Sequence, residues 1–286
     1  GDAVGVWKDL SGNGNDLLTQ TNILPTLVTD SFNKYKVNFN GSSYLSKANS
    51  EDLEITQSPH TIIVVTKTND VTENDVISTN LDENLNGASL LMFYQNRFRS
   101  HSWRGSEANT IDSDLTVNSG TEYLLGHIVS NDNIKILIDG KLSNTKSITG
   151  YTNNYSDDFI LGARHEVETR RYKGNISEIL VFDKEVDATE IVELNYYLSN
   201  KWNLTSTVDS DGDGLMDADD PEPTIPLVAW YQFNDSSDLG KDSSGFGNNL
   251  SIYNNEIVNY STNASEGVGS AEFDGGSTFL RNDFGQ

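Results

Sequence analysis

The stretch NIKILIDGKL (residues 133–142) predicts the fold more directly than any other part of the sequence. Ile134, Ile136 and Ile138 occupy every second position, so their side chains share one face of an extended strand. An Asp-Gly dipeptide follows, and it favours a tight hairpin turn because both of its residues tolerate a positive φ. We therefore expect a β-hairpin with one apolar face here.

Five further apolar stretches have the length and composition of short β-strands. They are TIIVVTK (61–67), SLLMFYQ (89–95), YLLGHIV (123–129), FILGA (159–163) and ISEILVF (176–182). The first of them is apolar without alternation, which indicates a strand covered on both faces. Because Asn- and Gly-rich turns separate many short strands, the sequence predicts an all-β fold, an antiparallel β-sandwich.

The stretch VDATEIVELNYYLSNKW (186–202) departs from this pattern and predicts a helix. Asp187 is placed as the N-cap, and Glu190 follows three residues later as in a capping box. Four apolar residues fall on one face at helical spacing, namely Ile191, Leu194, Leu198 and Trp202. We expect one C-terminal helix packed on the edge of the sandwich.

Two motifs recur in the same order at spacings that agree to one residue. DLSGNGNDL (9–17) returns as DSSGFGNNL (242–250), and VNFNGSSYL (37–45) returns as AEFDGGSTFL (271–280). This agreement predicts a tandem repeat of a whole domain.

The repeat divides the chain into three expected parts. Residues 1–204 form a first sandwich without its N-terminal strand, 205–226 form an Asp-rich calcium-binding linker, and 227–286 begin a second sandwich. LVAWYQF (227–233) opens the second copy, and its counterpart in the first copy would precede residue 1. We therefore expect the sequence to be a segment of a longer polypeptide.

The charge and composition of the chain limit the classes of partner that it is expected to bind. The formal net charge is -24 and cysteine is absent. No stripe of basic residues offsets the negative electrostatic field of this charge, so nucleic acid is not an expected partner. Divalent cations are expected partners. The lack of cysteine excludes disulfides and thiolate metal sites. No run of about 18 apolar residues occurs, so the sequence predicts no membrane span.

The stretch DSDGDGLMDADDP (209–221) contains six aspartates, whose mutual repulsion favours a bound cation. Carboxylates stand at loop positions 1, 3, 5, 9 and 12, a glycine stands at position 6, and position 7 offers a backbone carbonyl. This is the ligand order of an EF-hand-type loop, which supplies Ca²⁺ with about six to eight oxygens. The predicted Ca²⁺ ligands are Asp209, Asp211, Asp213, Leu215, Asp217 and Asp220.

The loop resembles those of thrombospondin type 3 repeats and dockerin-like linkers, which implies a stiffened connection between extracellular domains. A second cation at Asp9 or Asp242, in the repeated D-x-S-G-x-G-N loop, is an alternative to an Asx-type turn. We prefer the turn, in which the two glycines supply the unusual φ angles.

Five motifs occur in a characteristic order along the chain: VWKDLSGNGND, LIDGKL, LGA, YKGNISEILVFDKEV and EIVELNYYLSNKWNL. This order resembles the laminin-G-like, concanavalin A-like jelly-roll domains of bacterial extracellular proteins. The resemblance covers residues 1–204 and, as the opening of a second copy, 227–286. It implies two curved antiparallel sheets with a ligand face on the concave side or the loop rim, as in carbohydrate-binding modules, adhesins and enzyme appendages.

Catalysis is not expected. Retaining glycosidases of this fold carry an E-x-D-x-E or E-x-D-x-x-E run, which holds two carboxylates about 5 Å apart. In SEILVFDKE (177–185), Glu178 and Asp183 are five residues apart and therefore face opposite sides of a strand. Ser-His-Asp, phosphate-loop and H-x-x-x-H patterns are also missing from the sequence.

Two basic islands stand out in so acidic a chain. The first supplies Arg97, Arg99, His101, Trp103 and Arg104, and the second supplies Arg164, His165, Arg170 and Arg171. They predict a glycan platform on which Trp103 stacks against a sugar while arginines bind hydroxyls or carboxylates. The alternative is that these charges solvate loops and pair with nearby acids.

The expected function is therefore non-catalytic binding or adhesion outside the cell, either secreted or at a bacterial surface. The expected partner is a polysaccharide or cell-surface glycan, with Ca²⁺ in the linker. One alternative is a spacer or filament subunit that contacts neighbouring domains or copies of the same protein. The other is an accessory module of a polysaccharide-degrading enzyme.

Overall fold

The computed structural model describes most of the first two thirds of the chain and shorter stretches after it. The described residues are 1–19, 22–48, 53, 59–79, 89–104, 107–148, 158–164, 170–224, 231–233, 236–241, 249–252, 259–262, 270–272 and 280–281, without the side chains of 78, 79, 89, 102–104, 107, 108, 252 and 281. The chain divides into two compact units, Gly1–Ser210 with Met216–Thr224, and Asp211–Leu215 with Ile225–Gln286. The boundary passes through residues 209–220, which form one continuous loop.

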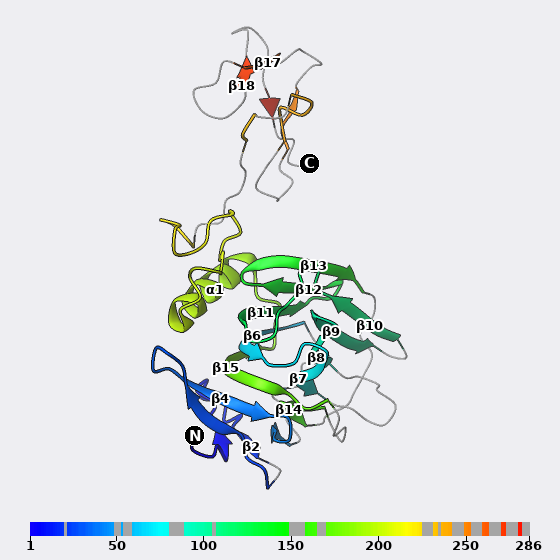
Figure 1. The fold of residues 1–286 in the computed structure, drawn as a ribbon. Coiled ribbons are helices and arrows are strands. Elements are labelled where there is room, and N and C mark those ends of the chain that lie inside the picture. The colour runs from blue at the N-terminus through cyan, green and yellow to red at the C-terminus, as the bar shows by residue number, and fades with distance from the viewer. Residues whose placement is uncertain are drawn as a thin grey trace. The chain divides into compact units, whose positions relative to one another are not determined.

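The first unit is a sandwich of two antiparallel sheets (Figure 1). The eight-stranded sheet contains, in spatial order, β1 (Val6–Trp7), β2 (Leu17–Thr19), β5 (Leu45–Lys47), β14 (Phe159–Leu161), β7 (Glu73–Thr79), β8 (Ser89–Tyr94), β9 (Arg97–Arg104) and β10 (Glu107–Asp112). The seven-stranded sheet contains β13 (Lys141–Ser147), β12 (Asn133–Ile138), β11 (Glu122–Val129), β6 (His60–Thr68), β15 (Lys173–Phe182), β4 (Tyr35–Asn40) and β3 (Thr26–Thr29). The predicted all-β sandwich is confirmed.

The β-hairpin predicted from residues 133–142 forms as expected. β12 and β13 pair with Ile138 opposite Lys141. Between them, Asp139 and Gly140 have φ angles of 52° and 86°, so both residues of the turn adopt the predicted positive values. The alternating isoleucines of β12 are buried in the core between the two sheets.

β6 is covered on both faces, as its unbroken apolar sequence predicts. Ile62 and Val64 belong to the core between the sheets, whereas Ile63 and Val65 belong to a second apolar cluster on the outer side of the seven-stranded sheet. Successive side chains of a strand point to opposite faces, so one strand contributes to both layers.

The predicted helix is α1 (Ala188–Trp202), and its N-terminus carries the predicted capping box. Asp187 Oδ1 accepts a hydrogen bond from the Glu190 backbone N–H at 2.9 Å. In return, Glu190 Oε2 accepts one from the Asp187 N–H at 3.0 Å. Two of the N–H groups that a helix start leaves unpaired are satisfied in this way.

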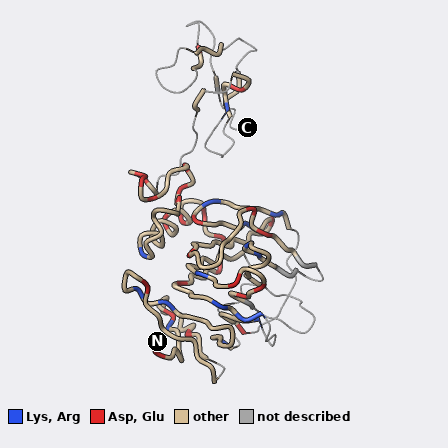
Figure 2. The backbone as a smooth tube through the Cα atoms, viewed as in Figure 1, with Lys and Arg blue, Asp and Glu red and all other residues tan. Residues whose placement is uncertain are grey.

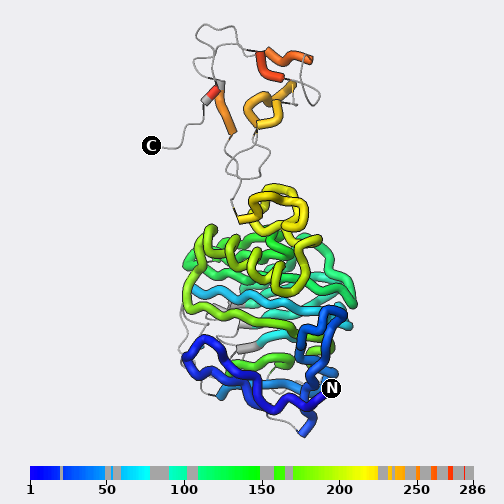
Figure 3. Tube along the Cα trace, turned by 90° about the vertical axis from the view of Figure 1, so that its left-hand side faces the viewer, coloured from blue at the N-terminus to red at the C-terminus, as the bar shows by residue number. Residues whose placement is uncertain are grey.

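The expected position of the helix on the sandwich edge is wrong. α1 packs on the outer face of the seven-stranded sheet (Figure 3), where Leu198 and Trp202 join the cluster that contains Ile63 and Val65. The strands beneath it, β6 and β11, are interior strands of that sheet. An apolar face this wide is buried better by a sheet face than by an edge.

Glu178 on β15 holds the C-terminal end of α1 to the sheet. Its carboxylate accepts hydrogen bonds from Trp202 Nε1 at 2.6 Å and from Lys201 Nζ at 2.7 Å. This residue, one of the three carboxylates of the 177–185 stretch, therefore serves the packing of the helix.

The described residues of the second unit form two short strand pairs. β16 (Ser251–Ile252) pairs with β19 (Leu280–Arg281), and β17 (Asn259–Ser261) pairs with β18 (Ser270–Glu272). When the repeated motifs are aligned, these pairs have the same register as β2 with β5 and β3 with β4 in the first unit. The agreement supports the predicted repeat, whose domain boundaries remain a prediction.

Among the described residues, no helix is both long and apolar enough to cross a lipid bilayer.

Candidate functional site

Strand β9 carries alternating buried and exposed side chains. Phe98 and Ser100 are fully buried on the inner side, whereas Arg99 and His101 lie on the outer side and are partly exposed. This alternation follows from the two-residue period of a strand. The basic residues of the first island are thereby separated from the core and presented on the outer face of the eight-stranded sheet.

The two neighbouring strands fix the Arg99 side chain. Arg99 lies opposite Asp112 of β10, and its guanidinium binds that carboxylate through two nitrogens, with Nη2 at 2.7 Å from Oδ2. On the other side its guanidinium lies 3.9 Å from the ring centre of Tyr94 on β8. A bidentate ion pair and a stacked ring together give a planar, oriented cation.

His101 lies two residues further along β9 and is held by Thr110 of β10, with Nδ1 and Oγ1 2.8 Å apart. Burial, together with the charges of Arg99 and Arg164, lowers the pKa of His101 to about 4. The imidazole is therefore neutral at physiological pH and offers hydrogen bonds rather than charge.

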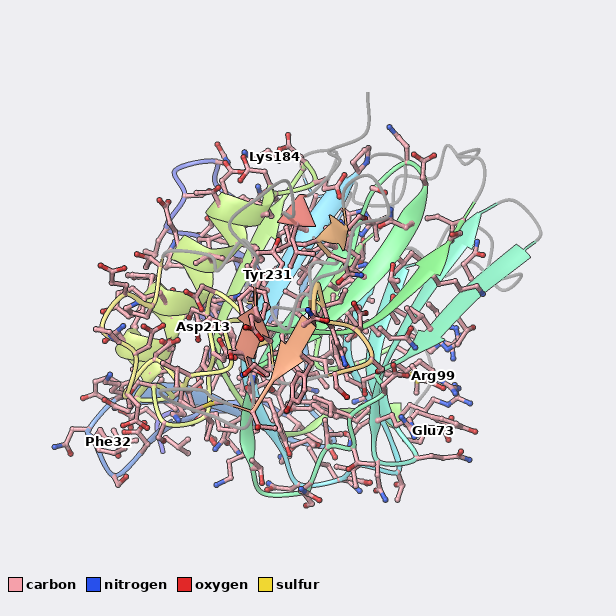
Figure 4. All side chains as sticks on the ribbon, turned by 90° about the horizontal axis from the view of Figure 1, so that it is seen from above. Phe32, Glu73, Arg99, Lys184, Asp213 and Tyr231 are labelled. Carbon is pink, nitrogen blue, oxygen red and sulfur yellow. The ribbon has the colours of Figure 1, made fainter. Side chains whose placement is uncertain are left out.

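The two basic islands meet in one pocket of about 220 Å³. It is lined by Glu73, Met92, Tyr94, Arg99, His101, Arg164 and Arg170. Arg170 Nη2 lies 2.7 Å from Glu73 Oε1, so the acid among these lining residues is paired. Figure 4 shows Arg99 and Glu73 on the same flank of the sandwich. Sequence spacing alone does not show this convergence.

Other residues of the two islands lie outside this pocket. Arg97 donates hydrogen bonds to the backbone carbonyls of Ser113 and of Asp114, the latter at 2.8 Å. Arg171 donates to the carbonyl of Ser42 at 2.5 Å. The side chains of Trp103 and Arg104, and the whole of His165, lie outside the described residues.

Sequence reasoning missed Asp75, which lies beneath the pocket. It stands opposite Met92, a pocket residue, and its side chain is 0% exposed. Neither of its carboxylate oxygens has a hydrogen-bond partner among the described residues. Burial raises the pKa of Asp75 to about 7, against the opposing effect of Arg164 and Arg170.

No sequence signal would have identified Asp75 as buried. The stretch 73–79 is not among the predicted strands, and a register shift after Asp75 brings both Val76 and Ile77 into the core. Such a bulge changes the face to which a strand residue points, and it depends on pairing with a distant strand.

The pocket is cationic within an acidic molecule. Figure 2 shows acidic residues spread over the described chain. Three guanidinium groups nevertheless line this one pocket, together with one acid, Glu73. Because the surrounding field is negative, a local excess of arginine marks a surface that favours anionic or hydroxyl-rich ligands.

The aspartate-rich loop brings together three of its six predicted Ca²⁺ ligands. One carboxylate oxygen from each of Asp209, Asp211 and Asp213 lies within 4.8 Å of the other two. Asp209 and Asp211 are buried, and Lys141 Nζ lies 2.9 Å from Asp209 Oδ2. Three carboxylates at this spacing provide the oxygen chemistry that Ca²⁺ prefers, so the residues fit the ion.

The remaining predicted ligands have other contacts. Asp217 accepts hydrogen bonds from the Ser210 N–H and Oγ, each at 2.8 Å, and from Ser199 on α1. Asp220 accepts one from the Glu222 N–H at 2.8 Å. Leu215 donates its N–H to Asp213 Oδ1 at 2.7 Å. The Ca²⁺ ligand set remains a prediction, with Asp217 serving to tie the loop to the helix.

The Asp9 loop has the preferred Asx-type turn. Asp9 accepts hydrogen bonds from the Ser11 and Asn15 N–H groups at 2.8 and 2.9 Å, and these bonds lower its pKa. Gly12 and Gly14 have φ angles of 91° and 76°, as that turn requires. Asp242 and its loop lie outside the described residues.

Solved structures of the same fold include binding domains of botulinum neurotoxins. The binding domain of botulinum neurotoxin DC in complex with SialylT has a TM-score of 0.51 and 15% identity, and the match covers 66% of this chain and 48% of that one. A type C neurotoxin whose cell entry depends on two ganglioside molecules has a TM-score of 0.50 and 14% identity, with 69% and 51% covered. The chain thus spans about half the length of these structures, and the likeness shows the fold alone.

No curated protein matches the sequence. A family model, Laminin_G_3, described as the concanavalin A-like lectin/glucanases superfamily, matches residues 39–192, which is more than half of the chain. The match includes the strands that build the pocket and most of the strands of both sheets. The chain therefore belongs to the concanavalin A-like lectin/glucanase superfamily.

Proposed function

We propose that this chain is a non-catalytic, extracellular glycan-binding module whose binding site is the pocket on the outer face of the eight-stranded sheet. The observation that carries the proposal is the convergence of Arg99 and His101 with Arg164 and Arg170. A patch that merely solvated loops would leave these two islands apart.

The chemistry of the pocket suits a sugar. Planar guanidinium groups present several fixed N–H donors to hydroxyls or carboxylates, and neutral His101 adds a hydrogen-bonding ring. The aromatic ring of Tyr94 and the thioether of Met92 add apolar contact surface. A sugar ring needs both kinds of contact, because its faces are apolar and its rim is polar.

Two carboxyl groups near the pocket do not favour hydrolysis. Glu73 and Asp75 form the first part of an E-x-D run, but Ile77 and Ser78 stand where its third carboxylate would be. Asp75 is inaccessible, and Glu73 is paired with Arg170. A retaining glycosidase needs two carboxyl groups that both reach the scissile bond, and this arrangement offers one.

A glycan array probed with the whole chain tests the proposal. We expect binding to at least one polysaccharide or oligosaccharide, weakened at least tenfold in Arg99→Gln and Arg170→Gln. The matched control is Arg97→Gln, on the same strand but outside the pocket, which should retain binding. If no glycan binds, or if pocket and control variants behave alike, the proposal fails and the spacer alternative is favoured.

We further propose that the loop around Asp209, Asp211 and Asp213 binds Ca²⁺ and stiffens the connection to a second sandwich-type domain. The supports are the ligand order of the sequence, the spacing of these three carboxylates and the repeated strand register. When bound, the ion would neutralise the repulsion between the aspartates.

Calcium titration of the whole chain tests this second proposal. At a Ca²⁺ concentration about 100 times Kd, the expected gain in stability is about 2.7 kcal/mol. Asp211→Asn should abolish it, whereas Asp219→Asn, an aspartate of the same stretch without an assigned ligand role, should not. A chain that takes up no Ca²⁺ at millimolar concentration, or an equal effect of both variants, contradicts the proposal.

A further inference from the structure

Asp75 is the most unusual polar group among the described residues of the sandwich. It is fully buried and both of its carboxylate oxygens lack a hydrogen-bond partner in the described part of the chain. Leaving a buried carboxylate without partners is costly, so native proteins rarely keep such a group without a use for it. Its location under the arginine pocket indicates that this use concerns the pocket.

The three guanidinium groups of the pocket are matched by three carboxylates only when Asp75 is included among the carboxylates. Among the described residues, Arg99 is paired with Asp112 and Arg170 with Glu73. Arg164 has no carboxylate within 4.0 Å in the described part of the chain, and the carboxylate that acts on its charge most strongly is Asp75. With Asp75 ionised these groups are neutral as a set; with Asp75 protonated they carry one positive charge.

We propose that the pocket binds an acidic sugar, whose single negative charge pairs with Arg164, and that Asp75 takes up one proton from solvent when this ligand binds. The proposal rests on the glycan-binding function proposed above and specifies its ligand class. An incoming anion and an ionised Asp75 compete for the same guanidinium, so the carboxyl that cannot leave is the one that becomes neutral.

Comparison with the other groups around the pocket assigns the uptake of this proton to Asp75. The charged and titratable groups that face the pocket are Glu73 on β7, Tyr94 on β8, Arg99 and His101 on β9, Arg164 after β14, and Arg170 before β15. The arginines stay charged over the relevant range, and the pKa of His101, at about 4, keeps that ring neutral.

The direction of the pH dependence follows from the pKa of Asp75, which is about 7 before ligand binds. Below that pH the carboxyl is already protonated and the pocket is ready for an anion. Above it, each binding event must also bind a proton, so affinity falls by about tenfold per pH unit. A neutral sugar does not compete for Arg164, and its affinity should not change with pH.

The experiment uses the whole chain and an array of acidic oligosaccharides, uronate oligomers, sialylated glycans and sulfated glycans, each beside its neutral counterpart. The strongest acidic ligand and its neutral counterpart are then titrated by calorimetry between pH 5.5 and 8.5. We expect the acidic member to bind at least tenfold more tightly at pH 6 and to lose this advantage above pH 7. Carboxylated and sulfated glycans distinguish the two sources of the negative charge.

Proton uptake is measured on the unmodified protein by repeating the titration in two buffers of different ionisation enthalpy. We expect uptake that approaches one proton per ligand at pH 8 and vanishes at pH 5.5. Uptake near zero at both pH values would overturn the role of Asp75, with or without a folded variant.

Variants assign the effects to residues. Asp75→Asn should bind the acidic ligand independently of pH, as tightly as the unmodified chain does at pH 6. Arg164→Gln should lose the preference for the acidic member, whereas Arg97→Gln should keep it. If Asp75→Asn retains the original pH dependence, or if acidic and neutral members bind equally, this inference fails while glycan binding stands. If nothing binds, the proposed function itself fails.

Discussion

The two outer faces of the sandwich are built from different chemistry. On the seven-stranded sheet, apolar side chains such as Ile63 and Val65 are covered by α1, and Glu178 pairs with groups at the end of that helix. On the eight-stranded sheet, the pocket region presents Arg99 and His101, above a buried carboxylate that lacks partners among the described residues.

This difference separates stability from function. On the helix-covered face, polar groups such as Glu178 are hydrogen-bonded and apolar surface is buried, and both contributions stabilise the folded state. The pocket face contains Asp75, a buried carboxylate that lowers the stability of the fold. Residues that lower stability in this way are concentrated at functional sites. Substitutions on the first face should therefore change unfolding and leave binding unchanged, and those on the second should do the reverse or even stabilise.

The largest effect is expected from Leu198→Ala on the helix-covered face. Leu198 is 1% exposed and packs in the cluster between α1 and the sheet. Its truncation leaves a cavity and should lower the free energy of unfolding by about 3–5 kcal/mol, measured by urea denaturation. Glycan affinity below the unfolding transition should stay unchanged.

The neighbouring residue provides the control for this prediction. Tyr197 is 52% exposed, and Tyr197→Ala should change the free energy of unfolding by no more than about 0.5 kcal/mol. Equal losses in the two variants would show that the helix is not held by its apolar face.

A smaller effect of opposite sign is expected from Asp75→Asn on the pocket face. The pKa of Asp75 is raised from 3.8 to about 7. Between these values the folded protein holds a proton that the unfolded chain has lost, so stability falls as the pH rises through this window. The variant has no such proton to lose and should be more stable by about 2–3 kcal/mol at pH 8, with little difference at pH 4.

Thermal unfolding of both proteins across this pH range measures the effect. Parallel stability curves for the unmodified chain and Asp75→Asn would mean that Asp75 is paired or hydrated in the folded protein, and the contrast between the two faces would be lost.

The smallest effect is expected at the start of α1. Asp187→Ala removes the side chain that accepts from the Glu190 N–H, and loss of an N-cap lowers the free energy of unfolding by about 1 kcal/mol. Asp183→Ala removes the same charge from a nearby exposed position and should cost less than half as much. A Asp187→Ala variant as stable as Asp183→Ala would show that the capping box contributes nothing beyond charge.

Local features of this fold could be predicted from the sequence because short-range interactions determine them. The 139–140 turn needs two residues that accept positive φ, and the α1 capping box joins residues three apart. The unbroken apolar run of β6 indicates burial on both faces without knowledge of its neighbours.

Features that depend on distant parts of the chain could not be predicted. The helix covers a sheet face because residues of β6 and β11 project outward together beneath it. Arg164 and Arg170 meet Arg99 only after β14, β7, β8 and β9 have paired in order, and Asp75 is placed by a bulge. Asp217 binds Ser199, 18 residues earlier, instead of joining the other aspartates. Register across a sheet is a long-range property, and a shift of one residue exchanges the two faces.

The most direct test of the central claim is to map which face binds the ligand. Amide chemical-shift changes in the ¹⁵N-labelled chain, followed during titration with the strongest oligosaccharide from the array, report the contacted surface. We predict that the changes concentrate on residues 73–75 of β7, 92–94 of β8 and 99–101 of β9, with Arg164 and Arg170, and spare α1. Changes centred on α1 or on the 209–220 loop would contradict the assignment of the pocket as the binding site.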